Sequence, residues 1–343
     1  MSIPNTTKNL LANLPPLPSL REILKMYGLQ ASKQLSQNFL LNLHVTDKIV
    51  RCCGDLTNKT VVEIGPGPGC LTRSILAHNP KRLIVVEKDE RFMPVLQNLQ
   101  QSVDDGKMHI VQGDVLKVDQ FKLMDHFLAP EEKIKKSDDE MANVVFIGNL
   151  PFGIATPLLI NWLRDVSNGT GAFAFGKKIP MILMFQKEVG LRMSAKTSTK
   201  EFGRLSVSSQ SLCDVEHMFV VKAKSFVPAP DVDASVMRLI PKSEPLIDND
   251  LVHFEDLEQF CRIIFNGKRK QLQTNLAAYF STKQCVYIAA GAVEGGSKNM
   301  PEVNLVLAKR SQDLTIEEIT SMARRFVRLR ESDPNLKESL KKA

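Results

Sequence analysis

The sequence lacks the cysteine and histidine patterns that hold metal ions. Its six cysteines include no C-x-x-C pair and no zinc-ligand spacing, and its six histidines form no ligand spacing with acids or cysteines. We therefore expect no metal site. We interpret the cysteines as reduced thiols in the core of an intracellular protein. They are Cys52, Cys53, Cys70, Cys213, Cys261 and Cys285.

The sequence also lacks long apolar runs and a secretory signal peptide. No run approaches the roughly 20 residues of a membrane-spanning helix, so we expect no membrane association. Residues 1–21 contain no acidic residue but carry Lys8 and Arg21, which is compatible with a mitochondrial matrix-targeting segment. The segment is poor in arginine and its prolines interrupt any amphipathic helix, so composition alone leaves targeting open.

What the sequence does contain is enough apolar material for a large core and an excess of cations. Hydrophobic residues make up 43% of the 343 residues, which argues against global disorder and suits one large domain with a smaller second one. The formal net charge is +7. Such an excess favours a polyanionic partner only where the cations gather in one place.

Short β-branched strands alternate with helical segments through the first half of the chain. This rhythm is typical of βαβ units in a parallel sheet that is covered on both faces. Two later apolar segments, 215–222 and 232–240, are expected to form a hairpin that closes one edge of the sheet. Strands are expected at 60–64, 83–87, 108–111, 144–147 and 180–185, and helices at 46–53, 70–78, 91–101, 119–128 and 156–166.

The remaining segments separate or extend these units. Ser19 and Glu22 form a capping box for a helix at 20–27, whereas residues 36–40 predict no element of their own. A linker is indicated by Pro241 to Pro245, and the periodicity beyond it becomes helical. Surface loops are expected at 130–142 and 167–178.

Three glycines spaced two apart follow the strand at 60–64, in the run Gly65-Pro66-Gly67-Pro68-Gly69. Glu87 comes 22 positions after Gly65, a distance at which an acid accepts hydrogen bonds from ribose hydroxyls of a dinucleotide or of S-adenosylmethionine. The prolines remove amide donors that a pyrophosphate would use. The pattern therefore favours a ligand without phosphate, such as adenosine joined to the methionine zwitterion.

Polar residues follow other strands as well, and Asn149-Leu150-Pro151-Phe152 is the most informative group. Methyl transfer to an aromatic amine is difficult because the nitrogen lone pair is delocalised into the ring. A side-chain carbonyl at Asn149 and a backbone carbonyl could each accept one N–H of the amine and free that lone pair. Pro151 makes the turn rigid, and Phe152 offers a ring for base stacking, worth about 1–3 kcal/mol. Catalysis would then rest mainly on positioning.

These motifs together resemble the rRNA adenine N6-dimethyltransferases, a family of class I S-adenosylmethionine-dependent methyltransferases. The resemblance runs from about residue 19 to residue 280. It implies a Rossmann-like doubly wound α/β sheet with a closing antiparallel hairpin, and a small α-helical C-terminal domain. The matching segments are Gln37–Leu40, Glu63–Gly69, Glu87-Lys88, Gly113–Val115, Gly148–Phe152, Phe226–Leu239 and Phe265–Leu276.

The resemblance also implies roles for individual residues. The cofactor would be enclosed by Asn38 and Leu40, its methionine part lined by Gly65, Gly67 and Gly69, and its ribose held by Glu87 beside Lys88. The cofactor's adenine amino group would bond Asp114, with Val115 adjacent. Asn149 and the Leu150 backbone would bind the target amine, whereas Phe152 and Phe226 would stack on the target base. RNA phosphates would contact Lys268, Arg269 and Lys270.

The substrate implied by the resemblance is a pair of adjacent adenines in the 3′-terminal hairpin loop of small-subunit rRNA, each receiving two methyls on its 6-amino nitrogen. A base in a single-stranded loop can reach an active site more easily than a paired base. The likeness is strongest to the mitochondrial branch, in the Leu14–Leu40 segment and at Phe185–Val189. It implies a matrix protein that acts as a monomer on the assembling small ribosomal subunit, with the mitochondrial transcription machinery as a further possible partner.

Three function classes remain at this stage. The first is an rRNA dimethyltransferase, with an N-terminal extension at 1–18, a methyltransferase domain at 19–242 and a helical RNA-contacting domain at 247–343. The second is a non-catalytic nucleic-acid-binding factor on the same scaffold. The third, a nicotinamide oxidoreductase, is disfavoured by the glycine spacing and by the lack of a histidine that could relay a proton.

Overall fold

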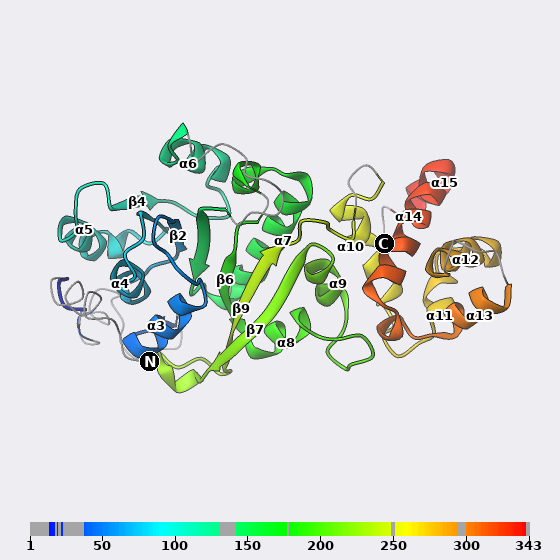
Figure 1. The fold of residues 1–343 in the computed structure, drawn as a ribbon. Coiled ribbons are helices and arrows are strands. Elements are labelled where there is room, and N and C mark those ends of the chain that lie inside the picture. The colour runs from blue at the N-terminus through cyan, green and yellow to red at the C-terminus, as the bar shows by residue number, and fades with distance from the viewer. Residues whose placement is uncertain are drawn as a thin grey trace. The chain divides into compact units, whose positions relative to one another are not determined.

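The computed structural model describes residues 14–17, 19, 22, 38–130, 142–176, 178–247, 251–293 and 300–340 (Figure 1). Its internal contacts divide the chain into two compact units. Unit 1 comprises Met1–Asn161, Gly171–Gly190 and Glu216–Ile240, and contains nearly all of the sheet. Unit 2 comprises Trp162–Thr170, Leu191–Val215 and Pro241–Ala343, and is mainly helical.

A seven-stranded sheet with the order β4-β3-β2-β5-β6-β9-β7 forms the centre of unit 1. The strands from β4 to β6 in this order pair in parallel, whereas β9 pairs antiparallel with β6. The bounds are β2 Thr60–Ile64, β3 Arg82–Glu87, β4 Met108–Gln112, β5 Val144–Gly148, β6 Met181–Gln186, β7 Cys213–Val221 and β9 Ala234–Pro241. A separate antiparallel pair joins β1, Phe39–Leu40, to β8, Phe226–Val227.

Helices follow most of the strands and make up most of unit 2. The α-helices are α3 Leu43–Arg51, α4 Cys70–Ala77, α5 Met93–Gln101, α6 Gln120–Phe127, α7 Phe152–Asn168, α8 Lys187–Met193, α9 Arg204–Gln210, α10 Phe254–Ile264, α11 Leu272–Leu276, α12 Thr282–Ala289, α13 Met300–Ala308, α14 Ile316–Ser332 and α15 Pro334–Leu340. The short 3-10 turns are η1 Glu90–Phe92, η3 Gly171–Phe175, η4 Ala223–Ser225, η5 Ala290–Ala292 and η7 Ser311–Asp313.

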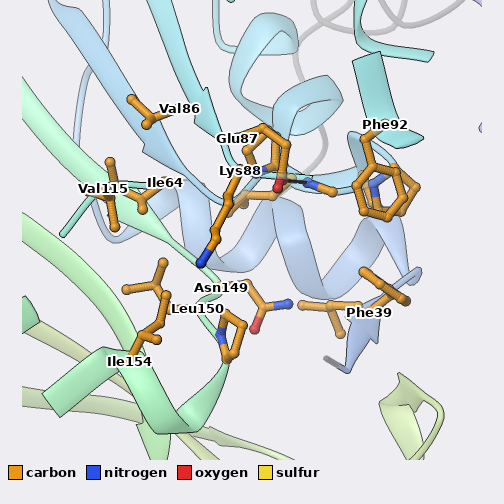
Figure 2. A pocket seen from close by; sticks show the side chains of 18 of the residues that line it. Phe39, Ile64, Val86, Glu87, Lys88, Phe92, Val115, Asn149, Leu150 and Ile154 are labelled. Atoms are coloured by element: carbon orange, nitrogen blue, oxygen red, sulfur yellow. Dashed lines mark hydrogen bonds between the residues drawn. The ribbon is translucent and has the colours of Figure 1, made fainter. Parts of the chain in front are cut away.

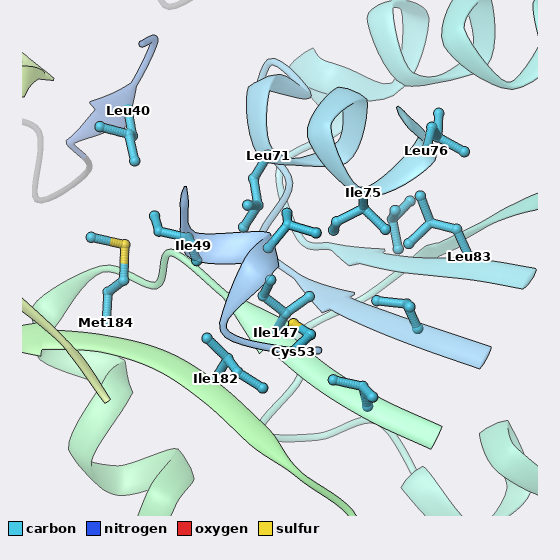
Figure 3. Close-up of a cluster of buried hydrophobic side chains, with 14 of the residues drawn as sticks. Leu40, Ile49, Cys53, Leu71, Ile75, Leu76, Leu83, Ile147, Ile182 and Met184 are labelled. Carbon is cyan, nitrogen blue, oxygen red and sulfur yellow. The ribbon is translucent and has the colours of Figure 1, made fainter. Parts of the chain in front are cut away.

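The core of unit 1 lies between one face of the sheet and helices α3, α4 and α5. The inner strands are apolar and almost wholly buried, as expected for parallel strands covered on both faces. Side chains from helices and strands meet in this layer, among them Ile49, Leu71, Ile75, Leu83, Ile147 and Ile182 (Figure 3). Full burial of each aliphatic side chain contributes about 1.5–3 kcal/mol, so this layer stabilises the packing of the helices on the sheet.

The predicted strands of the parallel sheet are confirmed, each to within one residue at either end. The segments 215–222 and 232–240 are confirmed as neighbouring strands at one edge of the sheet. The expected helix at 20–27 falls mostly outside the described residues, but its capping box is present, because the Ser19 backbone N–H donates to Glu22 Oε2 over 2.7 Å. The predicted loop at 130–142 also lies almost entirely outside the described residues.

Four local predictions were wrong, each for a physical reason. A surface loop was expected at 167–178, but η3 lies there and buries Phe173, whose ring packs 6.2 Å from the Phe146 ring between centroids. Residues 36–40 were expected to form no element, but Phe39 and Leu40 form β1 by pairing with distant residues, which a local pattern cannot reveal. Helix α3 was predicted to start at residue 46. It starts at Leu43, because the Asn42 side chain accepts from the backbone N–H groups of His44 and Val45. Helix α7 starts at Phe152, because the Pro151 carbonyl already accepts from two following N–H groups.

Within unit 2, aromatic contacts and ion pairs join the helices. The Phe326 ring of α14 lies 5.3 Å from the Phe260 ring of α10 and 6.1 Å from the Phe280 ring, between centroids. Arg330 of α14 forms an ion pair of 2.7 Å with Asp256 of α10. Some of the basic character at the end of α14 is therefore structural.

A buried carboxyl group lies in the middle of the sheet, at Glu63 of β2. Glu63 is 0% exposed and pairs in register with Val85 and Ile147. Neither of its carboxyl oxygens has a hydrogen-bond partner in the described part of the chain. Burial raises the pKa of Glu63 to about 8, because the charged form has lost its hydration. The residue is therefore protonated in the folded protein at neutral pH.

This burial predicts a pH-dependent stability. Between the ordinary value of 4.5 and about 8, the folded state holds one proton more at Glu63 than the unfolded state. The free energy of unfolding should therefore fall as pH rises through this window, by up to about 1.4 kcal/mol per pH unit. Glu63→Gln should remove this contribution. In urea unfolding, the free energy of unfolding of the variant should therefore rise relative to that of the wild type between pH 5 and pH 8.

The exposed glutamate Glu90 provides the matched control, as Glu90→Gln removes one carboxylate at the surface of the same unit. A constant difference between Glu63→Gln and wild type over the whole pH range would contradict the prediction.

Candidate active site

A cavity of about 270 Å³ opens at the carboxyl ends of β2, β3 and β5 in unit 1. This is the edge at which open parallel sheets bind ligands. Figure 2 shows its walls: Glu87 and Lys88 follow β3, Asn149 and Leu150 follow β5, and Phe39 and Phe92 lie at one side. The lining residues are Asn38–Leu40, Ile64–Pro68, Cys70, Leu71, Val86–Lys88, Phe92, Gly113–Val115, Asn149–Pro151 and Ile154.

The glycine turn has a backbone that L-residues with side chains adopt only with strain. Gly65 and Gly67 have φ angles of 66° and 55°. The Gly65 N–H donates to the Val86 carbonyl over 2.9 Å, which continues the β2–β3 pairing into the turn. A Cβ at Gly67 would lie 3.3 Å from the Phe39 ring, so a side chain there would press on one wall of the cavity. The turn thus places main-chain atoms at the cavity surface.

Glu87, at the end of β3, connects this turn to the next strand. Its Oε2 accepts from the Gly67 N–H over 3.0 Å, and its Oε1 accepts from the Asp89 N–H over 2.8 Å. The side chain is 5% exposed and lines the cavity. Burial raises the pKa of Glu87, while the backbone donors oppose that rise. Each oxygen retains a lone pair for a further donor, which fits the two hydroxyls of a ribose.

Asp114 and Lys88 form an ion pair at the mouth of the cavity. Lys88 Nζ lies 3.0 Å from Asp114 Oδ2, and Asp114 Oδ1 accepts from the Leu116 N–H over 3.1 Å. The hydrogen bond from Lys88, followed by that from Leu116, holds the pKa of Asp114 below its usual range. Asp114 is therefore an anionic acceptor at neutral pH, and the neighbouring Val115 provides an apolar wall. An adenine edge with its amino group matches this combination.

Asn149 and Leu150 present acceptor oxygens on the β5 side of the cavity. Asn149 Nδ2 donates to the Asn38 carbonyl over 3.4 Å, so the amide nitrogen faces the protein and Oδ1 is left as an acceptor. Within the described residues, no backbone N–H reaches the Leu150 carbonyl. Pro151 ends the turn, and α7 begins at Phe152. Two acceptors can thus receive the two N–H bonds of an amine.

Several predicted site residues do not line the cavity. Phe152 is half-buried and packs against the core at the first position of α7. Phe226 is 3% exposed in β8, opposite Leu40, so its ring presents no open face for stacking in this structure. Gly69 begins α4 behind the turn and is likewise outside the lining. The roles assigned to these three residues stay predictions.

The sequence patterns did not predict two aromatic side chains that line the cavity, Phe39 and Phe92. Phe39 and Phe92 pack edge to face, with centroids 5.6 Å apart. Phe92 ends η1, whose start is fixed when the Asp89 side chain accepts from the Arg91 N–H. The acid-cap pattern after Glu87 could have indicated this turn, but the inward direction of Phe92 depends on packing against the distant Phe39.

The basic triplet Lys268-Arg269-Lys270 lies in unit 2, on the turn between α10 and α11. Lys268 is half-buried and donates to the Lys200 carbonyl, and its burial lowers its pKa. Arg269 and Lys270 are exposed. Asn275 Nδ2 donates to the carbonyls of Ile264, over 2.7 Å, and Gly267, over 3.1 Å, and so holds the turn. The two exposed cations are the ones available to a phosphate.

The cavity fits S-adenosylmethionine better than it fits a dinucleotide. Its lining carries Glu87, which suits a ribose, and Asp114, which suits an adenine amino group. Main-chain atoms of the glycine turn and two aromatic rings complete it. Lys88 is its one lysine or arginine, and that side chain is engaged by Asp114. A pyrophosphate would lack cationic partners here, whereas a methionine zwitterion can bond main-chain groups.

Two structural searches gave negative results for the described residues. No helix there is long and apolar enough to cross a membrane. No group of three or more His, Cys, Asp or Glu side chains in that part of the chain could hold a metal ion.

Comparisons with known proteins show the family to which the chain belongs. The family model described as ribosomal RNA adenine dimethylase matches residues 28–298. The chain is 44% identical to the mitochondrial dimethyladenosine transferase 1 of Vermamoeba vermiformis, over 77% of this chain and 84% of that one. It is 42% identical to the mitochondrial dimethyladenosine transferase 1 of Homo sapiens, over 94% of this chain and 88% of that one.

Two solved structures have the same fold. A dimethyladenosine transferase from Plasmodium falciparum superposes with a TM-score of 0.61 at 24% identity, covering 84% of this chain and 98% of that one. The 23S rRNA methyltransferase ErmE superposes with a TM-score of 0.52 at 22% identity, covering 84% and 99%. The fold is therefore that of class I methyltransferases. With the family model matching most of its length, this chain belongs to the ribosomal RNA adenine dimethylase family.

Proposed function

We propose that this protein dimethylates the 6-amino nitrogens of two adjacent adenines in the 3′-terminal hairpin loop of mitochondrial small-subunit rRNA. At the coarser level it is a mitochondrial, S-adenosylmethionine-dependent rRNA adenine dimethyltransferase. The observation that carries the function is the placement of the Asn149 and Leu150 acceptors on the wall of the cofactor cavity. We propose that its partner is the assembling small ribosomal subunit, which carries this hairpin.

The residues of this chain would act mainly by positioning. When bound, S-adenosylmethionine supplies a methyl group on a positively charged sulfur. Asn149 Oδ1 and the Leu150 carbonyl would each accept one N–H of the target amine, which pulls the nitrogen toward tetrahedral geometry and frees its lone pair from the ring. The apolar surface around Leu150 and Ile154 would exclude water from the amine. Alignment of this kind can supply several kcal/mol of the barrier, about 7–11 in favourable systems.

No general base is required, and the ionisable side chains that line the cavity are already protonated, hydrogen-bonded or ion-paired. Burial raises the pKa of the Cys70 thiol to about 11, so that group stays protonated. Glu87 is bonded to backbone N–H groups, and Asp114 is paired with Lys88. The methylated amine is a strong acid because the base ring withdraws its electrons, so it can release its proton to water.

We further propose that unit 2 contacts the phosphates of the RNA through Arg269 and Lys270. Both are exposed on a turn held by Asn275, and the exposed Lys196 and Lys200 belong to the same unit. We also propose that the enzyme works as a monomer in the matrix. A purely nucleic-acid-binding function is less well supported, because it would not need the acceptors at Asn149.

Asn149→Ala tests the catalytic assignment directly. The variant loses the side-chain acceptor, so methylation of an unmethylated small-subunit rRNA hairpin or assembly intermediate by labelled S-adenosylmethionine should fall roughly 100-fold. Asn143→Ala is the matched control, since Asn143 is exposed beside the opposite end of β5. Equal label with Asn149→Ala and wild type would remove the assigned role of Asn149. Absence of label with wild type on a competent assembly intermediate would overturn the enzymatic function.

Arg269→Ala tests the phosphate contact. The loss of one cation from the α10–α11 turn should weaken RNA binding and reduce the slope of log affinity against log salt by about one, with cofactor affinity intact. Lys283→Ala removes an exposed cation from α12 in the same unit and serves as the control. If cofactor affinity fell as much as RNA affinity and the salt slope held, Arg269 would be a structural residue instead.

A further inference from the structure

Arg73, in the first turns of α4, is a buried cation behind the glycine turn. It is 4% exposed, and no carboxylate forms an ion pair with it within the part of the chain that the structure describes. Burial lowers its pKa, because the charged form has lost water. A guanidinium in such a place must be compensated by hydrogen bonds to neutral acceptors.

All the acceptors of Arg73 are main-chain carbonyl oxygens. Nη1 donates to Pro68 over 3.1 Å and to Gly69 over 2.8 Å, within the glycine turn. Nε donates to Pro15 and Nη2 donates to Pro16, each over 3.2 Å. One rigid, planar fork thus connects the turn to a segment more than fifty residues earlier in the chain.

The segment Leu14–Leu17 is well suited to be held in this way. Leu14 packs against the core of unit 1, which anchors one end of the segment. Pro15 and Pro16 have no N–H to donate and a fixed φ, so the segment is already extended and its carbonyls are available as acceptors. Little conformational entropy is lost when these carbonyls bind the guanidinium.

The third glycine of the turn is needed for Arg73. A Cβ at Gly69 would lie 2.8 Å from Arg73 Nη1, so a side chain there would force the guanidinium to shift from its present position. Gly69 has a φ of 81° and caps α4 without a side-chain hydrogen bond. The Arg73 guanidinium therefore binds carbonyl oxygens of the turn from behind, while Pro66, Gly67 and Pro68 line the cavity.

We infer that Arg73 is a positioning residue for the cofactor site, and that Leu14–Leu17 is part of that site because it holds Arg73 in place. This inference rests on the proposed function for the identity of the cofactor. Neither the segment nor Arg73 lines the cavity, but Arg73 binds the carbonyl of the lining residue Pro68, and in this way the two keep the turn in the conformation that binds. Without it, the turn would populate that conformation for a smaller share of the time, and the apparent affinity would fall by the same factor.

The test is a titration of the full-length protein with S-adenosylmethionine by calorimetry. In the first variant Leu14-Pro15-Pro16-Leu17 is replaced by Gly-Ser-Gly-Ser, which leaves Arg73 in place but removes the anchor and the fixed backbone. The control carries the same replacement at residues 10–13. The second variant is Arg73→Gln, the third is Arg73→Lys, and the fourth combines the segment replacement with Arg73→Gln.

The segment replacement and Arg73→Gln should each raise the cofactor Kd about tenfold, and the control should not. The combined variant should be no weaker than the single ones, because both changes break the same connection. Arg73→Lys keeps the charge but cannot reach all the carbonyls with one ammonium, so it should also lose affinity. Binding of the RNA hairpin and kcat at saturating cofactor should stay within about twofold of wild type.

An unchanged cofactor Kd for the segment replacement would overturn the inference, as would additive losses in the combined variant. A parallel loss of RNA affinity would show that Arg73 supports the fold in general and would overturn it as well. Should Arg73→Gln fail to fold, the segment replacement and Arg73→Lys decide. The titration needs no RNA. Wild-type protein that binds the cofactor but methylates no hairpin would therefore contradict the proposed function and leave the titration result for Arg73 and Leu14–Leu17 valid.

Discussion

The cofactor cavity depends on one buried carboxylate that receives two backbone N–H groups. Glu87 binds the N–H of Gly67 with one oxygen and that of Asp89 with the other. These bonds fix the turn after β2 against the end of β3, so the two main walls of the cavity cannot shift independently. Charge-assisted bonds of this kind are stronger than neutral ones, and burial adds to their strength. The remaining walls are built around this fixed pair.

Parts of the fold could be predicted because their causes are local. The strand at 60–64 and the turn after it follow from β-branched residues and then glycines, and parallel strands bring Gly65, Glu87 and Asn149 to one edge. Local patterns could not reveal β1, which exists through pairing with Phe226 and Val227. They also could not show that α9 packs with α10, because that contact joins segments on opposite sides of a predicted linker.

The site residues divide in the same way. That Glu87, Asp114 and Asn149 line the cavity was predictable, because each lies at or just after the end of a strand of the sheet. Phe92 lines the cavity only because it packs against Phe39, and Phe226 is withdrawn into the core by its pairing with Leu40. Side-chain direction in these cases is decided by a partner far away in the sequence. Arg73 carries no motif at all, since its acceptors are carbonyl oxygens, which every residue has.

Under the role proposed for Asn149, the orientation of its amide decides which bases can bind beside it. With its nitrogen turned toward the Asn38 carbonyl, the side chain offers only an oxygen to the substrate, beside the carbonyl oxygen of Leu150. An adenine brings two N–H bonds to this pair. A guanine or hypoxanthine would bring its exocyclic carbonyl oxygen at position 6 instead, so that acceptor oxygens would face one another. Leaving such groups unpaired costs about 1–3 kcal/mol each, so the cavity would discriminate against 6-oxopurines when the base binds, before methyl transfer.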